Sequence, residues 1–183
     1  MPATPPVCEF GWPAVPFELP DTEGRVWTLD SLRGPNGLLV MFICNHCPYV
    51  LAVADKLVTE AADLRELGIG VAAICSNDAV QYPADSFDKM GRFASEHGFT
   101  FPYLHDADQS VARAYGAACT PDFFGFNSDL ELQYRGRLDD SGRSGRPPDH
   151  RELHEAMRQV AETGEGPRQQ TPSMGCSIKW KAA

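Results

Sequence analysis

Two continuous apolar runs of strand length dominate the hydrophobic pattern of the chain, at residues 37–43 and 69–75. Uninterrupted runs of this length are typical of strands that are covered on both faces. Between them, from residue 48 to residue 67, apolar positions recur at spacings of three and four, which predicts a helix. Two further helices are predicted over 86–97 and 149–163, and a glycine follows the end of each of the three.

Shorter segments complete the pattern. Gly24 supplies the turn of an N-terminal hairpin between predicted strands at 17–21 and 25–29. Two late strands, at 122–126 and 130–138, follow one another without an intervening helix. The remaining predicted elements are a strand at 101–104 and a helix at 109–115. Alternation of strands and helices implies parallel pairing, and the late strand pair implies an antiparallel edge. The predicted fold is therefore α/β, a mixed central sheet with helices on both faces.

The chain has 183 residues, a length that suits one domain over residues 1–183. A proline-rich arm at 1–16 is predicted to lie over the surface of this domain. The tail at 165–183 shows no regular pattern. The stretch 139–148 is polar and rich in glycine and proline, so it is predicted to be a mobile loop.

The formal net charge of −9 argues against a nucleic-acid partner, because recognition of phosphates needs a basic surface. No apolar stretch reaches eighteen residues, so no membrane span is predicted. The first sixteen residues have neither the basic region nor the apolar core of a secretory signal. These features predict a cytoplasmic protein, and nothing in the pattern calls for a cofactor.

Six cysteines are spread unevenly along the chain, as one close pair and four single residues. The close pair is Cys44 and Cys47. An even number could form three disulfides, but a cytoplasmic chain of this length needs no covalent cross-links, and cytoplasmic thiols are kept reduced. We therefore predict one functional pair and four unpaired cysteines.

The pair joins the end of an apolar strand to the start of a helix, which is a setting for thiol–disulfide exchange. A helix N-terminus stabilises a thiolate through its free N–H groups and partial positive charge. We expect an exposed Cys44 to attack a substrate disulfide and Cys47 to resolve the mixed disulfide. Asn45 and His46 lie between them and are predicted to tune the thiol pKa, since a protonated His46 would favour the Cys44 thiolate.

Four cysteines and two polar residues remain outside this motif. Cys75 ends a buried strand and is predicted to be a small core residue, and Cys8 is expected to be incidental. Cys119 and Cys176 are candidate additional thiols. Cys176 could exchange with Cys44, or its segment could simply dock the tail through Ile178 and Trp180. Asn77 and Asp78 follow a parallel strand and could line the site, but exposed turn positions are the simpler interpretation.

Residues 17–34 resemble the N-terminal segment of the AhpC/TSA–redoxin proteins, and the segment from Cys44 to Pro48 is similar to the TlpA/ResA-type branch of the thioredoxin superfamily. The resemblance runs from about residue 17 to the last helix. It implies a thioredoxin fold with an added N-terminal hairpin. Thr120–Pro121 matches the cis-proline that faces the dithiol in that fold, which implies that the backbone of Thr120 binds a peptide substrate in strand fashion.

The chain departs from ordinary thioredoxins at two positions. Ile43 stands where many thioredoxins have tryptophan, and Leu38 stands where thioredoxin carries a buried acid. The second difference leaves the general base for Cys47 unassigned.

These observations predict a thiol–disulfide oxidoreductase whose partners are protein or small-molecule disulfides and a thiol redox partner. A peroxiredoxin-like peroxidase is the first alternative, although Met41 stands where the threonine of the usual peroxidatic motif would precede Cys44. A redox-inert or metal-binding adaptor is the second. No metal site is predicted, because the other cysteines and the histidines show no matching spacing.

Overall fold

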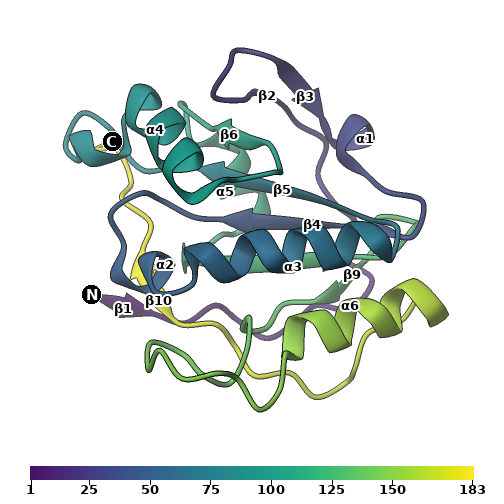
Figure 1. The fold of residues 1–183 in the computed structure, drawn as a ribbon. Helices are drawn as coiled ribbons and strands as arrows, with labels where there is room; N and C mark the ends of the chain where they lie inside the picture. Colours follow the sequence, from purple (N-terminus) through teal and green to yellow (C-terminus); the bar gives the residue numbers. More distant parts are fainter.

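The computed structural model describes residues 1–183 and has a five-stranded central sheet in the order β6-β5-β4-β8-β9 (Figure 1). Its strands are β4 (Gly37–Phe42), β5 (Ile69–Cys75), β6 (Tyr103–His105), β8 (Asp122–Phe126) and β9 (Leu132–Tyr134). The pairs β4–β5 and β5–β6 are parallel, whereas β4–β8 and β8–β9 are antiparallel. The predicted mixed sheet is confirmed.

The central strand β4 is buried at every position because both of its faces are covered. Successive side chains of a strand point to opposite faces. Leu39 and Met41 accordingly belong to one apolar cluster and Leu38 and Val40 to the other. The continuous apolar run in the sequence is therefore the signature of a strand between two helical layers.

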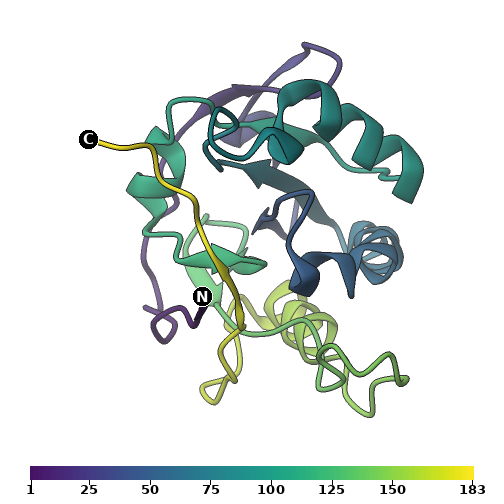
Figure 2. The ribbon, with the colours of Figure 1, turned by 90° about the vertical axis from the view of Figure 1, so that its left-hand side faces the viewer.

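Helices cover both faces of the sheet, as predicted. The first cluster receives side chains from α3 (Ala54–Glu66), α4 (Phe87–His97) and α6 (Glu152–Thr163). The second receives side chains from α1 (Leu29–Leu32) and α5 (Ser110–Tyr115). Figure 2 shows α3 and α5 on opposite sides of the sheet.

The predicted N-terminal hairpin is present as β2 (Glu18–Pro20) and β3 (Val26–Thr28). Its turn is fixed by Asp21, whose carboxylate accepts hydrogen bonds from the backbone of Glu23 and Arg25 and from the indole of Trp27. A short acidic side chain that satisfies nearby N–H groups is a common way to hold such a turn.

Three predicted elements differ most from the structure. The helix predicted over 48–67 is two helices, α2 (Pro48–Leu51) and α3, because the Val53 N–H bonds to Val50 and Val53 leaves helical geometry. The helix predicted to begin at residue 149 begins at Glu152, since Asp149 and His150 instead donate backbone hydrogen bonds to Asp140. The strand predicted over 130–138 is confined to β9. Beyond β9, the N–H groups of Arg135 and Arg137 bond to Gln170 and Thr171 of the tail.

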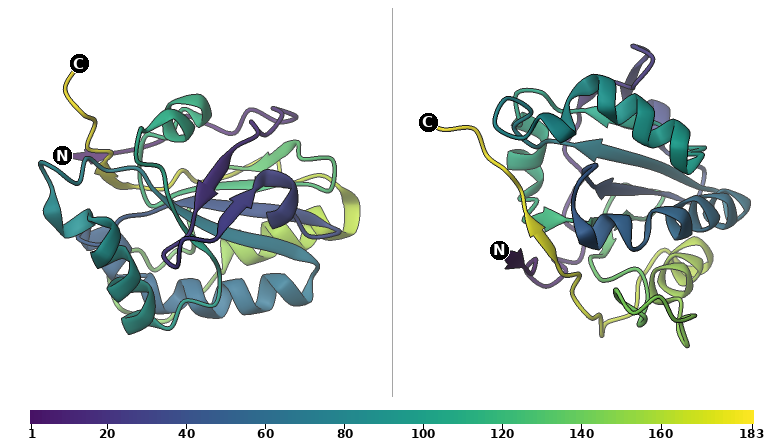
Figure 3. Two further views of the ribbon diagram at one scale, coloured as in Figure 1. Left: turned by 90° about the horizontal axis from the view of Figure 1, so that it is seen from above. Right: turned by 60° about the vertical axis from the view of Figure 1, so that its left-hand side comes forward.

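The tail contributes a strand that the sequence pattern did not predict. β10 (Gly175–Ser177) lies between β1 (Pro2–Ala3) and β7 (Cys119–Thr120) in a small antiparallel sheet. Figure 3 shows β10, in yellow, beside the N-terminal strand β1. The rest of the arm lies along β9, where backbone groups of Gly11, Trp12 and Ala14 bond to residues 130 and 132.

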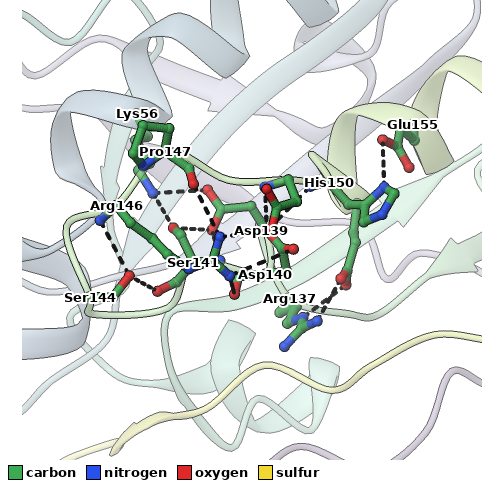
Figure 4. A network of polar contacts seen from close by, with 12 residues as sticks. Lys56, Arg137, Asp139, Asp140, Ser141, Ser144, Arg146, Pro147, His150 and Glu155 are labelled. Atoms are coloured by element: carbon green, nitrogen blue, oxygen red, sulfur yellow. Dashed lines mark hydrogen bonds and ion pairs between the residues drawn. The ribbon is translucent and has the colours of Figure 1, made fainter.

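The loop predicted to be mobile is tied down by polar contacts (Figure 4). Lys56 donates to Asp139 at 3.0 Å and also reaches Ser141. Arg146 bridges Asp140 and Asp149. The polar composition of residues 139–148 therefore supplies a network that fixes the loop against α3. No helix in the structure has the length and apolar character needed to cross a membrane.

Candidate active site

The two thiols of the Cys-x-x-Cys segment lie directly after β4, at the carboxyl edge of the parallel strands. Both are free thiols, with 1% of Cys44 and 0% of Cys47 exposed. The prediction of an exposed Cys44 is therefore wrong for this structure. The four-residue α2 starts after Cys47, which is its N-cap, so Cys47 and not Cys44 is the thiol next to a helix start.

A buried carboxylate that the sequence analysis missed lies beside this segment. Asp85, from the 3₁₀ turn η1 (Pro83–Asp85), has no exposed surface. It accepts hydrogen bonds from the backbone N–H of Asn45 and from Asn77 Nδ2, both at 2.8 Å. His46 Nδ1 lies 2.7 Å from Asp85 Oδ2. This buried acid follows β5 in the chain and lies beside Cys44.

Asn45 holds this carboxylate and the Cys-x-x-Cys segment together. In addition to its N–H, its side chain donates to Ala84 O at 3.0 Å and accepts from the Tyr103 hydroxyl at 2.8 Å. Both polar atoms of the Asn45 side chain therefore form hydrogen bonds with residues of other elements. No local sequence signal points to these partners, because they lie 39 and 58 positions away.

The surroundings of Cys44 favour its neutral thiol. Contact with the Cys47 thiol, burial and the nearby Asp85 carboxylate all raise the pKa of Cys44. The Thr120 hydroxyl, 3.4 Å from Cys44 Sγ, acts in the opposite direction. Deprotonation of Cys44 therefore needs a neighbouring group that takes up its proton.

The surroundings of Cys47 favour its thiolate. Contact with the Cys44 thiol lowers the pKa of Cys47, and Cys176 and the Val50 N–H add to this effect, whereas burial opposes it. The negative charge of the reduced pair is consequently stabilised on Cys47. Sequence reasoning had assigned the attacking thiol to Cys44, because it expected that residue to be the exposed one at the start of the helix.

Thr120 and Pro121 face the two thiols across the site. Their peptide bond is cis, as predicted. Cys47 Sγ lies 3.2 Å from Thr120 O. The backbone of Thr120 is paired with Cys176 in β10, so the edge predicted to receive a peptide carries the protein's own tail.

The other cysteines have distinct environments. Cys75 is a fully buried core residue at the end of β5, as predicted. Cys119 is also buried, and its thiol donates to Pro121 O at 3.5 Å. Burial raises the pKa of both thiols. Cys176 is partly exposed and packs against the cluster that contains Cys44 and Cys47.

Asn77 and Asp78 are buried, which corrects their interpretation as exposed turn residues. Asn77 bridges the site and the tail, because it donates to Asp85 and accepts from the Lys179 N–H at 2.9 Å. The Asp78 N–H donates to Lys179 O at 2.8 Å. The tail is also docked through Ile178, which is buried, and Trp180, whose ring lies under Arg113.

His46 forms part of the solvent-facing rim, with about a third (32%) of its side chain exposed. Its ring stacks on Tyr82 with centroids 5.8 Å apart, and Lys179 Nζ lies 5.7 Å from the same tyrosine ring. On the other side of α2, a groove of about 380 Å³ is bordered by Tyr49, Pro121 and other residues.

Cys44, His46 and Asp85 also bring three possible metal-binding atoms within 4.8 Å of one another. Zinc binds atoms of these kinds. Asp85 is, however, already surrounded by Asn45, Asn77 and His46, and Cys44 is held as a thiol. The hydrogen bonds from Asn45 and Asn77 thus engage both oxygens of the carboxylate that a metal ion would use.

The chain is similar to solved structures, to a relative in sequence and to a protein-family model. An uncharacterized conserved protein from Geobacillus kaustophilus has a solved structure that matches with a TM-score of 0.94 and 44% identity, over 100% of this chain and 98% of that one. The thioredoxin domain of a thiol-disulfide oxidoreductase from Bacteroides vulgatus matches with a TM-score of 0.58 and 13% identity, over 69% of this chain and 86% of that one. The latter similarity shows a shared fold.

A Mycobacterium tuberculosis protein named "Putative peroxiredoxin" is 31% identical over 101 residues, which are 55% of this chain and 59% of that protein. The alignment thus spans less than two thirds of the relative. The model of the AhpC/TSA family matches residues 10–135, which include the hairpin, the Cys-x-x-Cys segment and Thr120–Pro121. The chain therefore has a thioredoxin fold and belongs to the AhpC/TSA family.

Proposed function

We propose that the protein is a thiol–disulfide oxidoreductase in which Cys44 and Cys47 form the exchanging dithiol. The observation that carries the proposal is the convergence of both thiols with Asp85, His46 and Thr120 at one edge of the sheet. The groups that such exchange requires are two adjacent sulfurs, a stabilised thiolate and a proton acceptor. Each has a candidate among these residues.

In the first step, Cys44 gives up its proton to the His46–Asp85 pair and attacks a substrate disulfide. A bond forms between Cys44 Sγ and one substrate sulfur, the substrate S–S bond breaks, and the other substrate sulfur leaves as a thiolate. His46 is partly exposed and can return the proton to this leaving group. Asn45 acts as a positioning residue, because it holds Asp85 against the segment.

In the second step, the Cys47 thiolate attacks Cys44 Sγ and displaces the remaining substrate thiolate. The protein then holds a Cys44–Cys47 disulfide and has lost two electrons, which the substrate disulfide has gained. Cys176 and the Val50 N–H, which lower the pKa of Cys47, remain beside it after Cys44 has entered the mixed disulfide and support this resolving role. The reverse sequence oxidises a substrate dithiol.

The proposed partners are a protein or small-molecule disulfide and a thiol redox partner, with the cytoplasm as the proposed location. The acidic chain offers no basic surface for nucleic acid.

Trapping of the mixed disulfide tests the roles of the two thiols. Glutathione disulfide is mixed with Cys47→Ser, and the expected product is a stable glutathione adduct on Cys44, because no resolving thiol remains beside it. Turnover is expected to fall on the order of a hundredfold or more. Cys8→Ser is the matched control, since Cys8 lies in the arm, and it should behave as the parent protein.

Adducts on Cys47 in Cys44→Ser, with none on Cys44 in Cys47→Ser, would reverse the two roles. Absence of any adduct in both variants would refute the dithiol proposal. Metal analysis of the purified protein addresses the adaptor alternative, which requires a retained metal and no disulfide cycling.

Peroxide reduction is a second candidate, favoured by the stabilised Cys47 thiolate and by the relative named as a peroxiredoxin. Cys47 would attack one peroxide oxygen, the O–O bond would break, and the other oxygen would leave as hydroxide or alkoxide. The resulting sulfenic acid would condense with a neighbouring thiol to give a disulfide and water. Consumption of hydrogen peroxide with a thiol donor, lost in Cys47→Ser, would establish this activity.

A further inference from the structure

The protein's own tail occupies the edge of the site where an extended peptide could pair. β10 runs antiparallel to β7, with Cys176 opposite Thr120 and Ser177 opposite Cys119. Strand addition of this kind is a common mode of peptide recognition. The tail therefore presents a cysteine at the position where a substrate strand would lie.

Further contacts hold the tail in this position. Beyond β10, the Lys179 N–H donates to Asn77 Oδ1, and the Lys179 carbonyl accepts from the Asp78 N–H, both in the loop after β5. Gln109 Nε2 donates to Lys179 O at 2.9 Å, and Gln109 Oε1 accepts from the Lys181 N–H. Figure 2 shows the tail running across this end of the molecule. β10 is thus anchored on both sides of the site.

Cys176 lies against the dithiol. Cys47 Sγ lies 3.2 Å from Thr120 O, and Thr120 is the residue that β10 pairs with Cys176. Cys176 packs on the cluster that includes Cys44 and Cys47, and its presence lowers the pKa of Cys47. Its neighbour is Cys47, and not Cys44 as the sequence analysis had considered.

The three thiols differ in how accessible they are. Cys44 and Cys47 are 1% and 0% exposed, whereas Cys176 is partly exposed. Thiol exchange requires the attacking sulfur to reach the disulfide along the S–S axis, so burial limits the access of an external thiol to the pair.

We propose that Cys176 is a third redox thiol, which exchanges with Cys47 and connects the buried dithiol to an external thiol reductant. This inference rests on the proposed dithiol function and adds a route by which the oxidised pair is reduced. Cys176 would attack Cys47 Sγ in the Cys44–Cys47 disulfide, which breaks that bond, forms a Cys47–Cys176 disulfide and releases Cys44 as a thiolate. The step is an isomerisation and needs no external oxidant.

Two equivalents of an external thiol complete the cycle. The first attacks Cys176, forms a mixed disulfide with it and releases Cys47 as a thiolate. The second displaces Cys176 and leaves as the oxidised thiol, so the protein gains two electrons and the external thiols lose two.

The charges around Cys176 suit this order of events. Burial and the neighbouring Cys47 raise the pKa of Cys176 in the reduced protein, whereas Lys179 lowers it. Formation of the Cys44–Cys47 disulfide removes the charge on Cys47, so the effect of Lys179 is less opposed. Cys176 is therefore expected to become more reactive once the pair is oxidised.

Disulfide mapping tests the proposal. Cys44→Ser is oxidised with glutathione disulfide, quenched with acid and N-ethylmaleimide, and digested with trypsin without reduction. The expected product links the tryptic peptide 34–56, which then contains Cys47 alone, to the peptide 169–179, which contains Cys176 alone. The link should be lost in Cys44→Ser/Cys176→Ser and retained in Cys44→Ser/Cys119→Ser, which removes the other cysteine of the small sheet.

The same map of the oxidised wild-type protein distinguishes the role of Cys176 from the proposed dithiol function. It is expected to give both the disulfide within peptide 34–56 and a fraction of the link to peptide 169–179. Formation of the internal disulfide alone would overturn the role of Cys176 and leave the dithiol function intact. A stable glutathione adduct on Cys47 in Cys44→Ser, or a link from Cys47 to Cys119, would also overturn it.

A kinetic measurement complements the map. Reduction of the oxidised protein by glutathione is expected to slow in Cys176→Ser and to stay at the wild-type rate in Cys119→Ser. Equal rates in all three proteins would contradict the proposed route. Far-UV circular dichroism of each variant verifies that it is folded.

Discussion

Asp85 and His46 place a carboxylate and an imidazole beside Cys44. The surroundings of Cys44 favour the neutral thiol, whereas those of the adjacent Cys47 favour the thiolate. Asp85 is fully buried and fixed by Asn45 and Asn77, so its charge acts at short range in a poorly solvated region. This charge raises the pKa of Cys44, while the charge of the pair is stabilised on Cys47. At the residue scale, the asymmetry of the dithiol thus depends on a residue outside the Cys-x-x-Cys segment.

Replacement of Asp85 by asparagine tests this asymmetry. Removal of the negative charge is expected to lower the pKa of Cys44, so its alkylation by iodoacetamide should shift to lower pH. Exchange with glutathione disulfide should nevertheless slow, because a proton acceptor is lost. Asp106→Asn is the matched control, since Asp106 is equally buried but bonds to Ser76 and to the start of α5. An unchanged pH profile in Asp85→Asn would contradict the electrostatic account.

Asp139 provides a second test at the residue scale, through stability. Burial acts to raise the pKa of its carboxyl, but hydrogen bonds from Ser141 and Lys56 outweigh burial, so the pKa is lowered below 3.8. The stabilisation is therefore fully present above pH 3.8 and is lost as the pH falls through the lower value of the folded state. Asp139→Asn should cost about 1–3 kcal/mol at pH 7, and this difference should shrink below pH 4.

Urea unfolding at several pH values measures this difference. Asp149→Asn is the control, because that carboxylate is 79% exposed and pairs with Arg146 at the surface. Its effect should stay within about 0.5 kcal/mol. A cost for Asp139→Asn that persists at low pH would show that the stabilisation does not come from the charged form.

The residues that sequence analysis could and could not find differ in a physical way. Cys44 and Cys47 are recognisable by their spacing, and Thr120–Pro121 by its place directly before a strand. Both are patterns of neighbouring residues. Asp85 is one acid in a polar loop, and only the fold brings it to the end of β4. The burial of Cys44 was missed for the same reason, since Thr120 and the loop around Asp85 cover it from elsewhere in the chain.

At the scale of elements, β10 connects the tail to the site through backbone pairing. Gly175 lies so close to Thr120 and Pro121 that an added Cβ would overlap their backbone atoms. The sequence contained no strand signal here, because a three-residue strand has no measurable periodicity. The long runs that form β4 and β5 were predictable, since burial on both faces leaves a continuous apolar pattern.

Gly175→Ala is therefore expected to displace β10 without changing any sulfur. The cost should be about 1–3 kcal/mol, as for other overpacked positions, and Cys47 should react faster with N-ethylmaleimide because its cover is loosened. Gly91→Ala, in α4, is the control, since a Cβ there meets only ordinary contact with Thr22. Equal Cys47 reactivity in both variants would argue that β10 does not shield the site.

At the scale of the whole molecule, the fold gathers the functional groups at one end of the sheet. β4 ends at the dithiol, β5 ends at the loop that carries Asn77 and Asp85, and the tail crosses both. Ligands commonly bind at the carboxyl ends of strands in open α/β sheets. The alternation of strands and helices predicted this arrangement, and the placement of the tail over it required the structure.

The equilibrium between the dithiol and disulfide forms of Cys44 and Cys47 is the most direct test of the central claim. The full-length protein is equilibrated in buffers of graded redox potential, quenched, and its peptide 34–56 is measured by mass spectrometry. The account predicts a two-electron transition of this peptide at a midpoint between about −270 and −120 mV, the range of thioredoxin-fold oxidoreductases. A peptide that keeps both thiols across the whole range would contradict it.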